Sequence, residues 1–299
     1  NLDQEKAFDR VDWDFLYRLL ELLGFGFSFI RWVKLLYNNI NCRIICNDDL
    51  TDKFFPSRGV RQGCPLSPLL YIIIAEVLGC NIRASHFIEG FKLPGGPVFK
   101  LNQYADDTTC IVSNLYSLEK LLQLMDFYGK GTGAKLNVHK TETMWLGAWA
   151  LNPYQPFGIK WVTKLKILGV FFGSDTDRDN WDTRVDAFKN LTDSWLQRDL
   201  SIKGRVVVAT TLGLSKFLFV SKILIPPNYI FQKIQKILFH FLWRGKAHMV
   251  SRDVCYMSVA LGGLNVPDIK KKIWAFHLMY LRDFFDDNNS DWKFFFSYN

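Results

Sequence analysis

The chain has 299 residues, of which 49% are hydrophobic and 16% aromatic. This composition excludes a disordered protein, and the length suffices for two compact domains. Residues 1–159 carry 16 basic and 16 acidic side chains, whereas residues 160–299 carry 21 basic and 13 acidic ones, so the net charge of +8 lies in the second part. The asymmetry favours a polyanionic partner, most simply nucleic acid. A basic surface that only keeps the protein soluble is the alternative.

Two further classes of protein are disfavoured. The six cysteines are scattered, without C-x-x-C pairs or a histidine at zinc spacing. We therefore expect reduced, intracellular thiols rather than a disulfide framework or a zinc site. The most apolar stretch, residues 69–78, contains Glu76, so we expect no membrane-spanning helix and no membrane partner.

The first part of the chain is expected to mix helices and strands. Periodic apolar residues and end signals predict helices over residues 12–24, 27–38, 67–83 and 117–129. A hairpin turn is expected at residues 47–49, and further strands over residues 98–104, 108–113, 135–146 and 164–173. This order predicts an α+β fold rather than an alternating parallel α/β fold.

The second part is expected to be helical from residue 180 onward. Residues 228–243 place their isoleucines and leucines on one stripe, and a last helix is expected over residues 268–285. The polar run SDTDRDN marks the boundary between the two parts, near residues 175–180.

Two adjacent acids, Asp106 and Asp107, interrupt the strand-like run NQYADDTTCIV. An Asp pair at a hairpin tip usually stabilises the turn itself. A magnesium site would need a further carboxylate from a neighbouring segment. Asp3 is the candidate for that ligand, while Asp9, Asp12 and Asp14 compete with it and also suit the start of a helix. The spacing does not choose among them.

Five ordered motifs extend the pattern around these acids: LDQEKAFDRVDWDFL, RGVRQGCPLSP, YADD, LNVHKTE and LKILGVFFG. In this order they resemble the palm motifs of reverse transcriptases, in particular those of non-LTR (LINE-type) retrotransposons. The likeness continues through DLSIKGRVVVATTLGLSKFLFVSKILIPP and GGLNVPDI, which are similar to the thumb and the segment after it. The resemblance implies a right-hand polymerase palm, an antiparallel sheet packed on helices, in residues 1–175 with partial fingers elements. It further implies a helical thumb in residues 176–246 and a helical post-thumb segment in residues 247–299.

The resemblance also implies roles for individual residues. Asp3, Asp106 and Asp107 would hold metal ions, and Lys140 would donate a proton to the leaving pyrophosphate. Phe8 would stack under the incoming sugar and exclude a 2′-hydroxyl. The other implied positions are Arg61, Gln62, Gly63 and Tyr104 for substrate binding, and Leu168 and Gly169 for a primer grip. Ordinary alternatives stay open: core packing for Phe8 and Leu168, and a solvent-facing surface role for Arg61 and Lys140.

The activity implied is that of an RNA-directed DNA polymerase in target-primed retrotransposition. It would use two Mg²⁺ ions, with Mn²⁺ as the alternative, to join a dNTP to a primer 3′-hydroxyl on an RNA template. Its partners would be the RNA template, the DNA primer or target, and other segments of a retroelement polyprotein, including fingers and an endonuclease. We expect it in a cytoplasmic ribonucleoprotein and in the nucleus. The alternative is a catalytically inactive, nucleic-acid-binding relic of a decayed element.

The chain starts two residues before Asp3. A reverse transcriptase carries a fingers region before this position, so we expect the fingers to be largely missing and the isolated segment to be weakly active or inactive.

Overall fold

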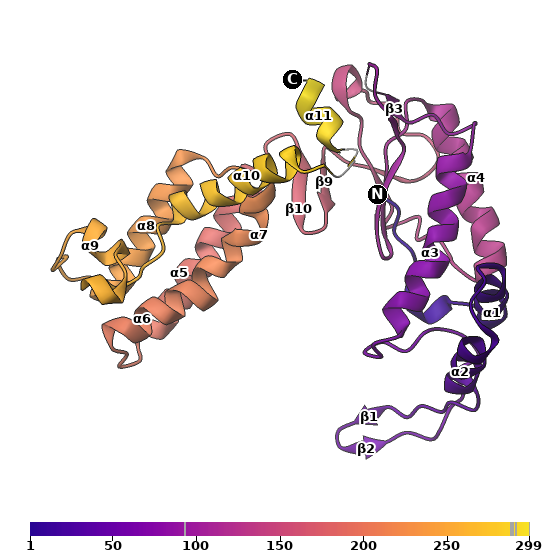
Figure 1. Ribbon diagram of the computed structural model, residues 1–299, viewed down its shortest axis with the longest axis horizontal. Helices are drawn as coiled ribbons and strands as arrows, with labels where there is room; N and C mark the ends of the chain where they lie inside the picture. Colours follow the sequence, from indigo (N-terminus) through magenta and orange to yellow (C-terminus); the bar gives the residue numbers. More distant parts are fainter. Residues whose placement is uncertain (93, 288–289, 291, 299) are drawn as a thin grey trace. The chain divides into compact units, whose positions relative to one another are not determined.

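The computed structural model describes residues 1–92, 94–287, 290 and 292–298 (Figure 1). The chain separates into two compact units, Asn1–Ile167 and Leu168–Asn299. This boundary lies N-terminal to the position expected near residues 175–180. Lys160, Lys164 and Lys166, which were counted above with residues 160–299, belong to the first unit because it extends to Ile167. The positive surplus is consequently shared, with 19 basic and 16 acidic residues in the first unit and 18 and 13 in the second.

The helices of the first unit begin and end close to the predicted residues. They are α1 (Trp13–Leu22), α2 (Phe27–Tyr37), α3 (Ser67–Ala84) and α4 (Leu115–Thr132). The Asp12 carboxylate caps α1 by accepting a hydrogen bond from the Phe15 N–H at 2.8 Å. Asn114 caps α4 in the same way, which extends that helix beyond the predicted residues 117–129. Lys100 Nζ binds the carbonyl oxygens at the end of α3, those of Arg83 and Ser85 included.

The strands of the first unit form short pairs. Antiparallel pairs join β1 (Ile45–Cys46) to β2 (Asp49–Leu50), β3 (Phe91–Lys92) to β4 (Val98–Phe99), and β5 (Leu101–Tyr104) to β6 (Asp107–Cys110). β7 (Glu142–Thr143) pairs with β8 (Lys160–Trp161) in parallel, which departs from the expected antiparallel pattern. The long strand predicted over residues 135–146 is wrong, because only its ends pair with neighbours, at Leu136 and at β7.

An extended segment at the start of the chain widens the β5–β6 hairpin. Leu2 forms an antiparallel bridge with Thr108 in β6, and Gln4 forms one with Leu136. The order across this central sheet is therefore β5, β6, the Leu2–Gln4 segment and the Leu136 segment. Its buried side packs with α1, α3 and α4 in one hydrophobic core, to which Leu2, Leu16, Leu78 and Leu121 contribute.

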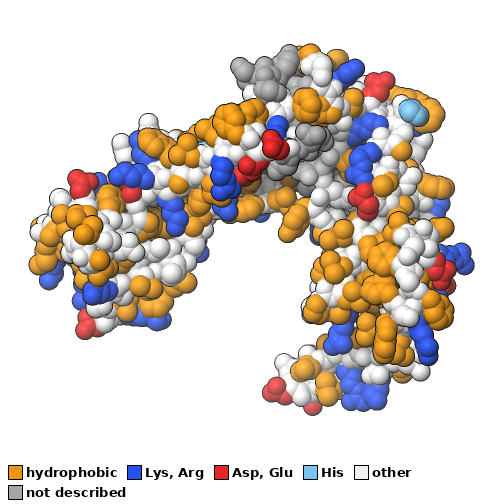
Figure 2. Space-filling model, viewed as in Figure 1, with side chains coloured by type: hydrophobic (Ala, Val, Ile, Leu, Met, Phe, Trp, Pro, Cys, Tyr) orange, Lys and Arg blue, Asp and Glu red, His pale blue; other side chains and the backbone are white. Residues whose placement is uncertain are grey.

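The second unit starts with β10 (Val170–Gly173), after β9 (Lys164–Ile167) has ended the first, and is otherwise helical. Its helices are α5 (Thr183–Leu196), α6 (Ile202–Val208), α7 (Ser215–Ile223), α8 (Asn228–Trp243), α9 (Arg252–Tyr256), α10 (Ile269–Phe285) and α11 (Trp292–Tyr298). The predictions for α8 and α10 are confirmed, and Asp268 caps α10. One core joins α5, α7, α8 and α10 around Phe188, Phe217 and Ile234. On the face shown in Figure 2, basic side chains of this unit are spread among hydrophobic ones rather than gathered in one block.

A π-helical segment, Ala209–Leu214, joins α6 to α7, and the sequence pattern did not indicate it. Gly213 lies in this segment against the fully buried ring of Phe188. A Cβ on Gly213 would lie 2.3 Å from Phe188 Cε2, far closer than two carbons can approach. The wide turn therefore coincides with the place where a helix backbone touches an aromatic ring.

Two helices, α3 and the run Ile202–Ile223, are long and apolar enough to cross a membrane by length and composition. This finding differs from the expectation of no membrane-spanning helix, which rested on Glu76 in residues 69–78. Their buried residues, Leu70 and Leu78 in α3 and Phe217 and Val220 in the second run, pack into the core of their own unit, as in a core helix of a globular protein. Absence of a membrane partner stays a prediction.

We expect Gly213→Ala to lower the free energy of unfolding of the second unit by about 1–3 kcal/mol, because the new methyl group must displace the immobile Phe188 ring. Gly204→Ala is the matched control, since a Cβ there meets Ser201 Oγ at an ordinary 3.5 Å. That helical substitution should be neutral or stabilise by about 0.5–1 kcal/mol. Urea titrations followed by circular dichroism measure both, and equal effects would contradict the packing argument.

Candidate active site

The backbone of Asp3 is held on one side by the segment that follows α4. Its N–H donates to Thr141 Oγ1 at 3.3 Å, and its carbonyl oxygen accepts from the Asn137 N–H at 2.8 Å. Thr141 is fully buried, and Asp3 is half-buried. Both hydrogen-bonding groups of Asp3 thus point away from β6, which lies on its other side.

β6 places Asp107 opposite Asp3. Leu2 bridges Thr108 in the antiparallel sense, so the next position of this ladder sets Asp3 against Asp107. Because the backbone groups of Asp3 face the other way, this pair is of the kind without mutual hydrogen bonds, in which facing side chains lie closest. The two carboxylates therefore share one face of the sheet.

Asp106 lies beside them at the tip of the β5–β6 hairpin. Tyr104 pairs with Asp107, so the turn consists of Ala105 and Asp106 alone, and Asp107 is the first residue of β6 rather than part of the tip. Ala105 adopts a positive φ of 53° to close this tight turn. A structural role in the turn and a role in a site are therefore compatible, because the two-residue turn presents both carboxylates at the end of the sheet.

The electrostatics of the three acids reflect their proximity. Burial raises the pKa of Asp107, and the neighbouring charges of Asp106 and Asp3 raise it further. Carboxylates that repel one another in this way favour a cation between them. Oxygen ligands on Asp3, Asp106 and Asp107 suit a divalent cation that keeps several waters and shares its site with substrate phosphates.

The acids do not form a closed cage by themselves. Within residues 1–92, 94–287, 290 and 292–298, no group of three or more His, Cys, Asp and Glu side chains stands in metal-binding positions. An ion bound by one or two carboxylates and completed by water or phosphate needs no such cage. The donor set therefore fits a divalent cation of that kind.

Phe8 lies in the short 3₁₀ helix η1 (Ala7–Arg10), close behind Asp3 in the chain. Its half-buried ring stacks on Tyr71 of α3, with the centroids 4.5 Å apart and the planes at 14°. The Tyr71 hydroxyl donates to Gln4 Oε1 at 3.4 Å. One face of the Phe8 ring is thus attached to the core.

The loop before α3 carries the predicted substrate-binding residues. Arg61, Gln62 and Gly63 are exposed, and Gln62 Nε2 donates to Asp9 Oδ1 at 3.4 Å. Gly63 has a φ of +84°, a conformation that favours glycine. Gly59 is more constrained, because its φ is +96° and a Cβ would lie 2.8 Å from the Asp9 carbonyl oxygen. This glycine holds the loop against η1.

The remaining predicted residues are Tyr104, Lys140, Leu168 and Gly169, and they belong to two different units. Tyr104 is exposed and pairs with Asp107, and Lys140 is exposed in the turn of residues 137–141, whose two ends bind the backbone of Asp3. Leu168 and Gly169, with φ of 47° and 85°, form the turn at which the second unit begins. All the predicted residues except Leu168 and Gly169 therefore belong to the first unit.

Three residues of this site escaped the sequence analysis: Tyr71, Thr141 and Gly59. Tyr71 reads as one more apolar position of a buried helix, and Thr141 as an ordinary strand residue. Only the bond from Asp3 to Thr141 and the stacking of Tyr71 on Phe8 reveal their positions. The glycine of the RGV motif was the one available signal for Gly59.

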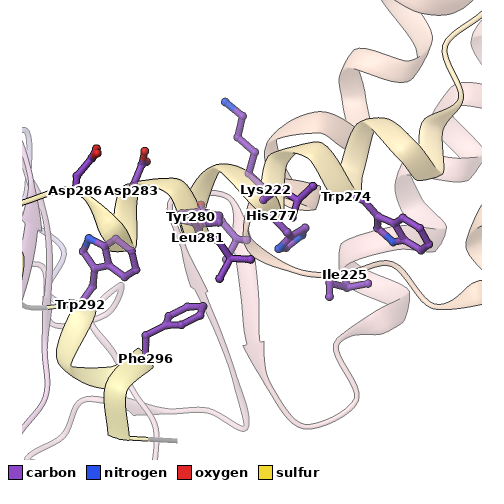
Figure 3. Close-up of a pocket in the computed structure, with 12 residues that line it drawn as sticks. Lys222, Ile225, Trp274, His277, Tyr280, Leu281, Asp283, Asp286, Trp292 and Phe296 are labelled. Atoms are coloured by element: carbon purple, nitrogen blue, oxygen red, sulfur yellow. The ribbon is translucent and has the colours of Figure 1, made fainter.

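The second unit has a groove of about 1080 Å³ between α7, α10 and α11. Figure 3 shows Trp274, His277 and Leu281 of α10 along it, while Asp283 and Asp286 point away from Phe296. His277 Nε2 and the Ser221 carbonyl oxygen, 2.9 Å apart, tie α10 to α7. None of the predicted site residues lines this groove.

We expect Asp107→Asn to increase the free energy of unfolding at neutral pH in buffer without divalent cations, because it removes an ionised group whose pKa is raised in the folded state. The gain should be complete above that raised pKa and vanish below the ordinary value of 3.8, where the wild-type carboxyl is protonated. Thermal denaturation from pH 3 to 8 measures it.

The matched control is Asp126→Asn, which removes the exposed ion pair with Lys130 on α4. This substitution should cost a small amount of stability at neutral pH, which is the opposite sign. A gain of the same size in both variants would mean that the effect does not come from the three acids.

The chain was also compared with known proteins. Residues 1–172 match the family model described as reverse transcriptase (RNA-dependent DNA polymerase). The chain is 31% identical over 300 aligned positions to the transposon TX1 uncharacterized 149 kDa protein of Xenopus laevis, covering 98% of this chain and 23% of that protein. It is 30% identical over 145 positions, 48% of this chain and 13% of the relative, to the retrovirus-related Pol polyprotein from the type-2 retrotransposable element R2DM of Drosophila melanogaster. A Pol polyprotein of the type-1 element R2 of Popillia japonica is 27% identical over 50% of this chain.

The chain spans about a quarter or less of the length of these relatives. The family model covers more than half of the chain, and it includes every acid of the candidate site. The mixed helices and small sheets of the first unit agree with the palm fold that this family implies. The chain therefore belongs to the reverse transcriptase family, in its non-LTR (LINE-type) retrotransposon branch.

Proposed function

We propose that this chain is the polymerase segment of an RNA-directed DNA polymerase that joins a dNTP to a primer 3′-hydroxyl on an RNA template. The observation that carries the proposal is the position of Asp3 opposite Asp107, with Asp106 at the adjacent hairpin tip. A nucleic-acid-binding relic would not need these carboxylates to face one another at a cost in repulsion. The longer protein would use this activity in target-primed retrotransposition.

The three acids would hold two Mg²⁺ ions. Bound there, the ions would activate the attacking hydroxyl and neutralise charge on the transferred phosphoryl group. The contribution of the chain itself is positioning, because the backbone of Asp3 is fixed by Thr141 and Asn137 and the hairpin fixes Asp106 and Asp107.

The neighbouring residues suit the handling of the nucleotide. Gln62 and Gly63 in the exposed loop offer an amide and an open backbone to the incoming dNTP, and Phe8 offers a ring under its sugar. Lys140 lies on the turn beside the acids and would donate a proton to the leaving pyrophosphate. The first unit would then be the palm.

The second unit would be the thumb with the segment that follows it. On the face shown in Figure 2, its basic side chains are spread rather than concentrated, as suits contacts with successive phosphates of a duplex without reading of sequence. Leu168 and Gly169, at the turn where this unit begins, would serve the primer grip.

The double variant Asp106→Asn, Asp107→Asn tests the proposal in the full-length protein that contains this chain. Mg²⁺-dependent dNTP incorporation on a primed RNA template should fall by about a thousandfold, because the charge that stabilises the transition state is lost. Binding of the same template, measured by fluorescence anisotropy, should not weaken.

The matched control is Asp48→Asn, Asp49→Asn, a second pair of adjacent acids at a hairpin tip, between β1 and β2. It should leave incorporation unchanged. Activity that survives in the Asp106, Asp107 variant would rule out a catalytic role of these acids. Loss of template binding in that variant alone would indicate that these acids only contribute to template binding.

Lys140→Gln should lower kcat of the full-length protein by about a hundredfold with little change in KM for the dNTP, because a general acid acts in the chemical step. Lys130→Gln, an exposed lysine on α4 that pairs with Asp126, is the control and should leave both constants unchanged. Steady-state primer extension measures them, and a change confined to KM would show that Lys140 only binds substrate.

A further inference from the structure

We propose that Tyr71 is a positioning residue that fixes the ring of Phe8 and thereby sets the discrimination between deoxyribonucleotides and ribonucleotides. The inference rests on the proposed function, in which Phe8 excludes the 2′-hydroxyl. The structural observation behind it is the parallel stacking of the two rings, at 4.5 Å and 14°.

A ring can exclude an oxygen atom only if it cannot move aside. Phe8 has little support of its own, because it belongs to a 3₁₀ helix of four residues, Ala7–Arg10, that follows a left-handed residue, Lys6. Such a short helix is not stable in isolation. The backbone of Phe8 is held by the Val60 N–H, which donates to its carbonyl oxygen at 2.8 Å. Stacking on Tyr71 supports the ring itself.

Tyr71, in contrast, is held from several sides. Its side chain is 2% exposed and lies in the core with Leu70 and Ile74 of the same helix. Its hydroxyl donates to Gln4 Oε1, and Gln4 is itself buried and bridged to Leu136. The residue therefore transmits the position of the central sheet to the Phe8 ring.

The same contact connects the ring to the acids. Gln4 follows Asp3 directly in the chain, so the hydroxyl of Tyr71 is bound next to a predicted metal ligand. Burial raises the pKa of Tyr71, and the charges of Tyr128 and Asp106 raise it further. The hydroxyl thus stays protonated and donates to Gln4, whereas the contact with Phe8 is made by the stacked ring of Tyr71 and not by its hydroxyl.

A leucine in place of Tyr71 would leave space into which the Phe8 ring can recede. Stacking of two aromatic rings contributes enough that its loss changes an equilibrium about two- to tenfold. We therefore expect Tyr71→Leu to raise kcat/KM for a ribonucleotide, relative to the matching deoxyribonucleotide, by about two- to tenfold. Tyr71→Phe keeps the ring and should retain the wild-type ratio.

The control separates positioning from general destabilisation. Tyr128 of α4 is an equally buried core tyrosine, 5% exposed, and its hydroxyl donates to the Ile74 carbonyl oxygen at 3.1 Å. Tyr128→Leu should lower thermal stability as Tyr71→Leu does, and leave the nucleotide ratio unchanged. Tyr71→Met, which fills more of the space, replaces the leucine variant if that protein does not fold.

The experiment is primer extension by the full-length protein on an RNA template with a dNTP and the ribonucleotide of the same base, for wild type, Phe8→Val and the three tyrosine variants. Relaxed discrimination in Phe8→Val and Tyr71→Leu, with wild-type ratios in Tyr71→Phe and Tyr128→Leu, supports the inference. A relaxed Phe8→Val beside an unchanged Tyr71→Leu overturns it and leaves the proposed function intact. Equal relaxation in Tyr71→Leu and Tyr128→Leu also overturns it.

Two further outcomes concern the proposed function. An unchanged ratio in Phe8→Val removes the role of the Phe8 ring, and with it that of Tyr71, while dNTP incorporation by the wild type still supports a polymerase. No template-directed incorporation by the wild type contradicts the polymerase itself.

Discussion

The antiparallel pairing of the Leu2–Gln4 segment with β6 is the constraint on which the site depends. It sets Asp3 against Asp107, although like charges opposite one another destabilise a ladder. The arrangement persists because both backbone hydrogen-bonding groups of Asp3 are bound to Thr141 and Asn137, and because Leu2 and Thr108 are buried beside it. Backbone pairing and burial thus hold the carboxylates of Asp3 and Asp107 close together despite their repulsion, which a bound cation would relieve.

The same segment organises the rest of the site. Gln4 receives the Tyr71 hydroxyl, and the chain continues directly into η1, which carries Phe8. Asp9 of η1 then meets the loop before α3 through Gly59 and Gln62. The acids, the aromatic pair and the loop before α3 are therefore parts of one connected structure, so a displacement of the Leu2–Gln4 segment would affect all of them.

The helices were predictable because their signals are local. Asp12 and Asp268 cap helices that begin at the expected residues, and the apolar stripe of α8 gives both of its ends. The strands were less predictable, because alternating apolar and polar residues do not indicate which other strand will pair with them. Residues 135–146 pair only at Leu136 and β7, and β7 pairs in parallel with β8. The π-helical turn at Gly213 lies against the ring of Phe188 in another helix, a contact that no local pattern records.

The sequence by itself determined which residues are candidates for the chemistry: an ordered set of motifs, two adjacent acids at a two-strand turn, and a third acid near the start of the chain. The tertiary structure alone decided which acid faces Asp107, that Thr141 holds Asp3 from 138 positions away, and that Tyr71 supports Phe8. The physical reason is that residue type and spacing fix local conformation and chemical capacity. Contacts between distant segments depend on burial and on ladder register, and these exist only once the chain has folded.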